Sequence, residues 1–409
     1  MTKISRTTDM TQGSEMRHII MFSLPLLAGN LLQQTYNIVD TMVVGRYLGD
    51  DALAAVGATG SITYLFYTLC IGLSVGAGII VAQYFGAGRQ KSLRSAVFNS
   101  ALVTAIFGVV ISLLSVPAAR PILELLKVPD KLIGDSVAYM QIACGGTIAV
   151  AAYNWINAIM RALGDSKTPL IFLGAASLLN ALLDLLFVVV FKFGIAGAAW
   201  ATVLTQALSA ISCIVYCFAV SGEIKLTADD LHTDKDMMSR CVKTGVPIAI
   251  QNGLISVSMV ALQRVTNGFG ETVMAAYTVS MRIEQFVQQP FSSLNAAVST
   301  FTGQNIGAGK EKRAQKGLAC AIKISVIFST VVLVLFTLFG GAITSWFVKG
   351  KTVISISAKA LIITSLFYWS LGIIHTTRGF LNGAGDTNYA LVNGMAEVIC
   401  RIGLSLILT

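Results

Sequence analysis

The sequence predicts an all-α, polytopic membrane protein built from two six-helix bundles. Three observations support this fold class. The chain of 409 residues is 55% hydrophobic and only 12% charged, about half the charge of an ordinary soluble protein. Apolar segments long enough to cross a bilayer recur over its whole length. An internal repeat relates the first half of the chain to the second.

Eleven membrane-spanning helices are expected, each from an apolar stretch of roughly 20 residues or more. Basic residues concentrate in the N-terminal tail and in every second connection, which predicts a multi-pass protein of the cytoplasmic (inner) membrane with its N-terminus in the cytoplasm. The expected spans are residues 19–44, 52–82, 93–116, 135–160, 169–191, 194–219, 241–265, 271–303, 317–347, 353–379 and 388–409.

Three short motifs recur at one common offset of 221 residues. An equal offset at separated places indicates duplication, and a repeat unit of six spans brings both copies into the membrane in the same direction. The predicted bundles are therefore parallel and related by a pseudo-twofold axis along the membrane normal. The pairs are Gln83-Tyr-Phe-Gly-Ala-Gly-Arg89 with Gln304-Asn-Ile-Gly-Ala-Gly-Lys310, Gly164-Asp165 with Gly385-Asp386, and Leu48-Gly49-Asp50 with Phe269-Gly270-Glu271.

The repeat predicts how the chain is divided. Residues 1–219 form an N-lobe of helices one to six, residues 220–240 a charged cytoplasmic linker, and residues 241–409 a C-lobe of helices seven to eleven. The repeat position of span six lies beyond Thr409. We therefore expect a twelfth helix to be missing and the sequence to be a truncated fragment or a natural short form.

Polar residues on two of these helices predict a functional site inside the membrane. Gln33, Asn37 and Asp40 are spaced i, i+4 and i+7 in span one, so they share one helix face. Asn180 and Asp184 share a face of span five. A carboxylate at this depth costs several kcal/mol and by default marks an ion pathway or a binding site.

Span six adds the hydroxyl of Thr202 to this set. Carboxylate, amide and hydroxyl oxygens suit a hard cation such as Na⁺, and a pair of buried carboxylates can also bind and release a proton. We therefore predict a coupling-ion site at Asp40, Asn180, Asp184 and Thr202, with Na⁺ or H⁺ as the ion, and expect no organic cofactor. The alternative for Asn37 and Thr202 is hydrogen bonding between helices.

The second half of the chain has a different set of polar residues. Arg282 and Gln285 share a face of span eight, whereas Glu397 and Arg401 at i, i+4 are predicted to form a structural ion pair. His375 is predicted to be a packing residue. Aromatic and amide side chains around a central cleft would suit apolar cationic drugs. The candidates for such a cavity are Gln33, Gln34, Tyr36, Asn37, Tyr139, Asn154, Arg282 and Gln285.

Several functions are disfavoured. Gly86-Ala-Gly88 and Gly307-Ala-Gly309 do not follow strands and lack the Gly-Lys-Ser/Thr of a phosphate loop, so they are predicted to be helix C-caps. No nucleophile–His–acid arrangement or metal motif indicates an enzyme, and the seven scattered cysteines predict no disulfide. The basic residues lie in short loops, which argues against nucleic-acid binding. Because no ATPase motif is present, a transporter with this sequence must draw its energy from an ion gradient.

The chain resembles the multidrug and toxic compound extrusion (MATE) transporters over essentially its whole length. This resemblance implies twelve helices in two lobes, and export of small organic cations coupled to H⁺ or Na⁺ across the lipid bilayer, by a monomer. The matching motifs are Asn37-Ile-Val-Asp-Thr-Met-Val-Val-Gly-Arg46, Leu48-Gly-Asp-Asp-Ala-Leu-Ala-Ala-Val-Gly57, Gln83-Tyr-Phe-Gly-Ala-Gly88, Arg161-Ala-Leu-Gly-Asp165 and Gly385-Asp386.

Within this family the chain looks most like the DinF-like branch. That resemblance implies an ion site at Asp40, Asn180, Asp184 and Thr202, and a first helix that bends when the ion binds, which Pro25 would permit. The alternative is a lipid-linked oligosaccharide flippase of the same superfamily. Such a protein should line its cavity with several basic residues, whereas only Arg282 and Arg401 lie in mid-span.

Overall fold

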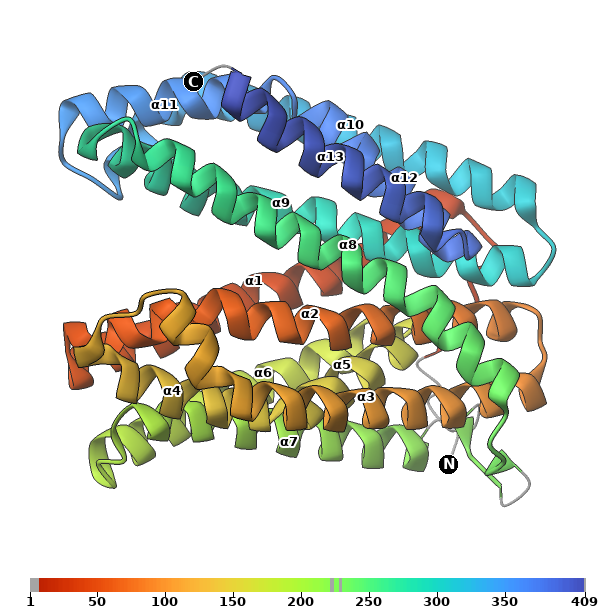
Figure 1. Cartoon of the computed structure of the whole chain (residues 1–409). Coiled ribbons are helices and arrows are strands. Elements are labelled where there is room, and N and C mark those ends of the chain that lie inside the picture. The colour runs from red at the N-terminus through yellow and green to blue at the C-terminus, as the bar shows by residue number, and fades with distance from the viewer. Residues whose placement is uncertain (1–6, 221–223, 228–229, 408–409) are drawn as a thin grey trace.

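The computed structural model describes residues 7–220, 224–227 and 230–407, and all regular secondary structure in this part is helical. The N-lobe contains α1 (Glu15–Leu48), α2 (Asp50–Gly86), α3 (Gln90–Leu125), α4 (Asp130–Gly145), α5 (Thr147–Ala162), α6 (Lys167–Asp184), the π-helical η1 (Leu185–Val190) and α7 (Gly194–Val220). The C-lobe contains α8 (Lys235–Asn267), α9 (Glu271–Gly307), α10 (Glu311–Ser345), α11 (Lys351–Ser365), α12 (Tyr368–Ala384) and α13 (Thr387–Ile407). In Figure 1 the N-lobe lies below and the C-lobe above, and the predicted fold class is confirmed.

Two of the expected spans are broken in the middle. Residues 135–160 form α4 and α5, which meet at Gly146 with a bend of 43°, and residues 353–379 form α11 and α12 with a bend of 51°. The breaks lie at equivalent places of the repeat, because Phe367 follows Gly146 by 221 residues. Ser112 donates to the carbonyls of Cys144 (2.9 Å) and Gly145 (2.8 Å), so carbonyl groups beside the first break find a new partner.

The linker between the lobes is shorter than the predicted range of residues 220–240. Helix α8 already begins at Lys235, because the Asp234 carboxylate accepts hydrogen bonds from the backbone amides of Asp236 (2.9 Å) and Met237 (3.1 Å) and so caps the helix. Residues 221–223 and 228–229 of the linker lie outside the described part of the chain. The twelfth helix expected beyond Thr409 stays a prediction.

The long helices of the structure differ in their hydropathy. Within the described residues, α2, α3, α6 with η1, α7 and α10 are each long and apolar enough to cross a membrane, and the two bent pairs bring the number to seven. The other four expected spans, α1, α8, α9 and α13, do not meet this criterion within the described residues. In α1, polar residues such as Gln33 and Asn37 interrupt the apolar sequence, and both are exposed on its surface.

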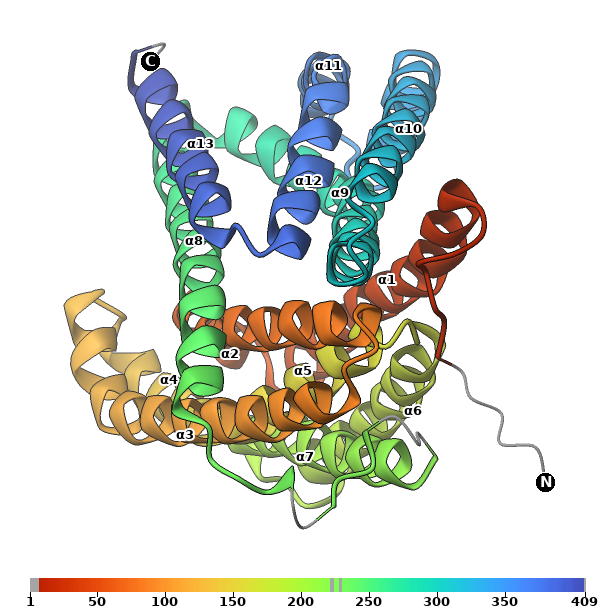
Figure 2. The same cartoon turned by 90° about the vertical axis from the view of Figure 1, so that its right-hand side faces the viewer.

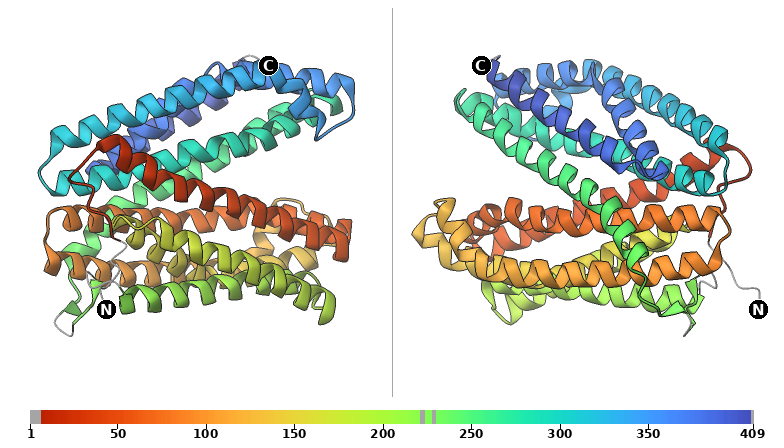
Figure 3. Two further views of the ribbon diagram at one scale, coloured as in Figure 1. Left: turned by 180° about the vertical axis from the view of Figure 1, so that it is seen from behind. Right: turned by 45° about the vertical axis from the view of Figure 1, so that its right-hand side comes forward.

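The lobes meet at one end of the molecule and diverge toward the other (Figure 1, Figure 3). The closed end carries the turns after Gly86 and Gly307, and the open end carries the turns at Gly49 and Gly270. Figure 2 looks onto the closed end and shows the C-lobe standing on α1 and α2, which contact α8 and α9. The arrangement is a V whose two arms are the lobes.

Candidate functional site

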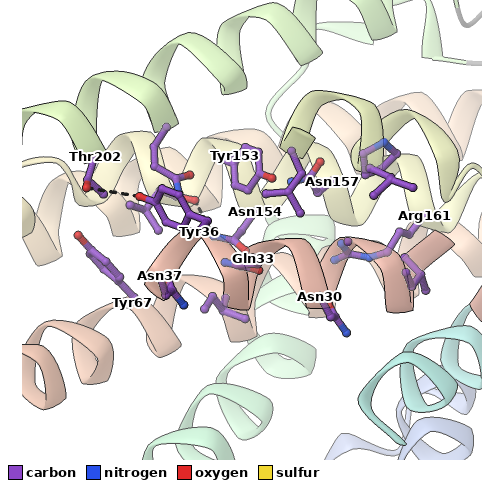
Figure 4. A pocket seen from close by; sticks show the side chains of 18 of the residues that line it. Asn30, Gln33, Tyr36, Asn37, Tyr67, Tyr153, Asn154, Asn157, Arg161 and Thr202 are labelled. Carbon is purple, nitrogen blue, oxygen red and sulfur yellow. Dashed lines mark hydrogen bonds between the residues drawn. The ribbon is translucent and has the colours of Figure 1, made fainter. Parts of the chain in front are cut away.

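A polar cavity of about 350 Å³ lies in the N-lobe (Figure 4). Helices α1, α2, α4, α5, α6 and α7 all contribute to its wall. Five of the predicted cavity residues line it, together with two residues of the predicted ion site. These residues are Gln33, Tyr36, Asn37, Tyr139 and Asn154, with Asp40 and Thr202.

Three predicted cavity residues do not line this cavity. Gln34 follows Gln33 on α1, and one helical step of about 100° turns its side chain away. Arg282 and Gln285 are exposed on α9 of the other lobe. Helix periodicity placed these residues on the right faces of their own helices, but the divergence of the lobes separates α9 from the N-lobe wall.

The polar residues of span one and span five come together beside this cavity. Asp184 is 0% exposed and Asn180 is 1% exposed, at the C-terminal end of α6. The carboxyl groups of Asp40 and Asp184 lie close enough to interact directly. Tyr36 donates from its hydroxyl to Thr202 Oγ1 over 3.4 Å, which connects α1 to α7 at the same place.

Several atoms of this cluster are buried without a hydrogen-bond partner. They are Asp40 Oδ1, both carboxylate oxygens of Asp184, and Asn180 Nδ2. A buried polar atom with no partner costs roughly 1–3 kcal/mol, and more when it is charged. The oxygen atoms are therefore suited to accept a cation or a shared proton, and no cluster of three or more His, Cys, Asp or Glu is found within the described residues that would suit a transition metal.

The backbone changes directly after Asp184. Helix α6 ends at this residue and continues as a π-helical turn, Leu185–Val190. π-Helical turns are frequent at functional sites. The sequence predicted one regular span over residues 169–191 and carried no signal for this turn, since the six residues are simply apolar.

Sequence reasoning missed Arg161. The positive-inside pattern counted it as a loop residue, but it lies in the last turn of α5 and lines the cavity. Asn157 also lines the cavity, and Figure 4 shows both side chains near Asn30 of α1. A signal was present, because Asn154, Asn157 and Arg161 at i, i+3 and i+7 share one helix face.

The carboxylate of Glu397 in the C-lobe is fully paired. Arg401 donates to its Oε1 over 2.7 Å, which confirms the predicted pair, and Arg378 of α12 donates to its Oε2 over 2.8 Å. His375 stacks on Phe291 with ring centroids 6.2 Å apart, which agrees with its interpretation as a packing residue. Among the described residues, the buried carboxylate oxygens without a hydrogen-bond partner therefore lie in the N-lobe. Pro25 and Asn30 of span one match Pro247 and Asn252 at an offset of 222, so Leu262 stands at the repeat position of Asp40.

Two parallel helix bundles, one of which holds a polar cavity between its helices, are the architecture of a polytopic membrane transporter. The chain belongs to the MatE family, whose model matches residues 25–186 and 247–407, one segment for each repeat.

Known relatives and solved structures agree with this assignment. "Probable multidrug resistance protein YoeA" of Bacillus subtilis is 31% identical over 393 residues, covering 94% of this chain and 85% of the relative. "Probable multidrug resistance protein YpnP" of the same organism is 29% identical over 386 residues, covering 94% and 86%. The fold matches a solved "outward-facing conformation of a multidrug resistance MATE family transporter of the MOP superfamily", with a TM-score of 0.91, 23% identity, and 98% of this chain and 90% of that chain covered.

Proposed function

We propose that this protein exports small organic cations from the cell in exchange for H⁺ or Na⁺. The observation that carries the proposal is the group of partnerless carboxylate oxygens of Asp40 and Asp184 beside the N-lobe cavity. The names of the two Bacillus subtilis relatives support a multidrug substrate range. The DinF-like assignment and a monomeric state belong to the same proposal.

The mechanism follows from competition between two ligands for one lobe. An ion at Asp40 and Asp184, with Asn180 and Thr202 beside them, stabilises one shape of the cavity, and a bound drug stabilises another. Each ligand then lowers the apparent affinity of the other through its preference between the two states. The ion and the drug are bound and released on opposite sides of the membrane, and this gives the exchange its direction.

The orientation belongs to the proposal as well. The closed end carries many basic side chains in its turns and helix starts, which the positive-inside rule places in the cytoplasm. The N-lobe cavity then opens to the outside in this structure. The basic residues at this end are Arg89, Lys91, Arg94, Lys167, Lys310, Lys312, Arg313 and Lys316.

The lipid-linked oligosaccharide flippase is the weaker alternative. A pyrophosphate group needs several cations, and Arg161 is the single basic side chain among the described residues that line the N-lobe cavity. No observation in the cavity favours this function.

Transport in proteoliposomes tests the ion site. With an imposed pH or Na⁺ gradient and the fluorescent cation rhodamine 123, we expect Asp40→Asn and Asp184→Asn each to lower gradient-driven transport by at least about tenfold, because each removes a charge that the ion must neutralise. Comparing the two gradients identifies the coupling ion. Asp50→Asn is the matched control, since Asp50 is exposed at the start of α2. Undiminished transport by both cluster variants would refute the proposed ion site.

A further inference from the structure

Arg161 is a positively charged residue at the end of the N-lobe cavity that lies toward the closed end of the molecule. It lies in the last turn of α5, at the closed end of the molecule, and borders both the 350 Å³ cavity and a second one of about 100 Å³ between α2, α5 and α9. Asp40 lies toward the opposite end of the same wall. Ten residues of α1 separate Asn30, beside Arg161, from Asp40, a rise of about 15 Å. The two charged groups therefore do not neutralise each other through a direct contact.

The Arg161 guanidinium has no protein partner among the described residues. None of the ion pairs and hydrogen bonds of this part of the chain involves it. Asp165, the acid nearest in sequence, is already engaged, because its carboxylate accepts from the amides of Lys167 (3.0 Å) and Thr168 (2.9 Å) and from the Thr168 hydroxyl (2.5 Å). The arginine therefore presents its donors to the cavity.

A second side chain at the same place also has an atom without a partner. Asn157 lies one helical turn before Arg161, is 5% exposed and lines the cavity, and its Oδ1 has no hydrogen-bond partner. Across from it, Asn30 donates from Nδ2 to Ser293 of the C-lobe over 3.1 Å. Figure 4 shows Arg161, Asn157 and Asn30 around one end of the cavity. An acceptor and a cation that both lack partners indicate a place for a ligand.

We propose that Arg161 binds the carboxylate of amphipathic ligands that enter this cavity. A guanidinium pairs with a carboxylate through two parallel hydrogen bonds, and these charge-assisted bonds are strong where water is excluded. Asn157 Oδ1 accepts a hydrogen bond from an N–H or O–H of the same ligand. One guanidinium matches one carboxylate, so the site selects organic molecules that carry a carboxyl group in addition to a basic amine. The inference deepens the proposed function, because it names a substrate class for the same cavity.

Two dyes that differ in one group test this inference. Rhodamine 110 has a free carboxylate, and rhodamine 123 is its methyl ester. Equilibrium binding of each dye to the full-length purified protein is measured by fluorescence anisotropy. We expect Arg161→Gln to weaken binding of rhodamine 110 by about tenfold or more, the loss that follows from removing charge-assisted hydrogen bonds. Binding of rhodamine 123 should change by less than about twofold.

Two further variants make the result specific. Arg161→Lys keeps the charge but not the planar fork, so it should recover part of the affinity for rhodamine 110. Arg46→Gln removes an exposed positive charge at the far end of α1 and should leave both affinities unchanged. Equal weakening of both dyes by Arg161→Gln, no weakening of either, or no binding of rhodamine 110 to the wild type would overturn the inference. Failure of ion-driven rhodamine 123 transport would instead contradict the proposed function, since the binding measurement needs no gradient.

Discussion

At Gly86 and Gly307 the backbones of the two lobes approach so closely that no Cβ atom would fit. A Cβ atom at Gly86 would lie 1.9 Å from the carbonyl oxygen of Gln304, and one at Gly307 would lie 1.9 Å from that of Gln83. The equal distances show the twofold relation of the repeat at atomic detail. The left-handed conformation that ends each helix belongs instead to Gly88 (φ +66°) and Gly309 (φ +70°). Each Gly-Ala-Gly motif therefore combines a packing glycine with a capping glycine, of which the sequence predicted only the cap.

Alanine at these positions separates the two roles. Gly86→Ala should push the lobes apart at the closed end, lower the thermal stability and broaden a spin-label distance measured across this end. Gly88→Ala is the matched control. It should cost about 1 kcal/mol for the left-handed backbone without changing that distance, because nothing lies within 4 Å of the added methyl group. Identical distance distributions for the two variants would show that the lobes do not meet at Gly86.

The segment that precedes α1, residues 7–14, connects the two lobes. The Thr8 amide donates to the carbonyl of Leu163 in the N-lobe (3.2 Å), and the Met10 amide donates to Gln304 Oε1 in the C-lobe (2.9 Å). Met10 is 1% exposed and packs among apolar residues of α1 and α9. Arg313 of α10 donates to three carbonyls of this segment, those of Met10 (3.1 Å), Gln12 (2.9 Å) and Gly13 (2.7 Å). The segment thus spans both arms of the V at the closed end.

Removing one side chain tests this attachment. Arg313→Ala leaves these carbonyls without their charged donor, so residues 7–14 should lose protection against hydrogen–deuterium exchange. The free energy of local unfolding at the closed end should fall by about 1–3 kcal/mol. Lys316→Ala removes an exposed positive charge from the same helix and should leave the exchange of this segment unchanged. Equal protection in both variants would contradict the role of Arg313.

At the scale of the whole molecule, the proposed orientation makes the cavity accessible from outside the cell. Asn37 is exposed and lines the N-lobe cavity, whereas Ser299 lines the small cavity between the lobes at the closed end. With the closed end in the cytoplasm, the two positions should differ in access from outside the cell. Five of the seven cysteines are buried, so replacing the other two, with Cys320→Ser and Cys400→Ser, should remove the background labelling of native thiols.

Thiol labelling of intact cells measures this access. A membrane-impermeant maleimide added outside should modify Asn37→Cys and leave Ser299→Cys unreacted, because the packed closed end excludes the reagent. Everted vesicles, which present the cytoplasmic side, serve as the comparison. Labelling of Asn37→Cys only in everted vesicles would reverse the proposed orientation.

Features that depend on residues near one another in the chain were predictable from the sequence. Lipid as a solvent requires long apolar helices, and a duplicated gene leaves a constant offset, so the helices and the two bundles could be read directly. Helix periodicity placed Asp40 beside Asn37 and Asp184 beside Asn180 on their own faces. The Glu397–Arg401 pair was predicted for the same reason, since both residues lie on one helix.

Features that depend on which helix faces meet were decided only by the tertiary structure. Packing of α1 against α6 and α7 brings Asp40 to Asp184 and Tyr36 to Thr202. Rotation of α5 turns Arg161 into the cavity, and the divergence of the lobes removes Arg282 from it. Periodicity describes one helix at a time, whereas the angle and rotation of neighbouring helices follow from side-chain packing over hundreds of residues. The sequence therefore determined the helices and their polar faces, and the packing decided which of those faces form the site.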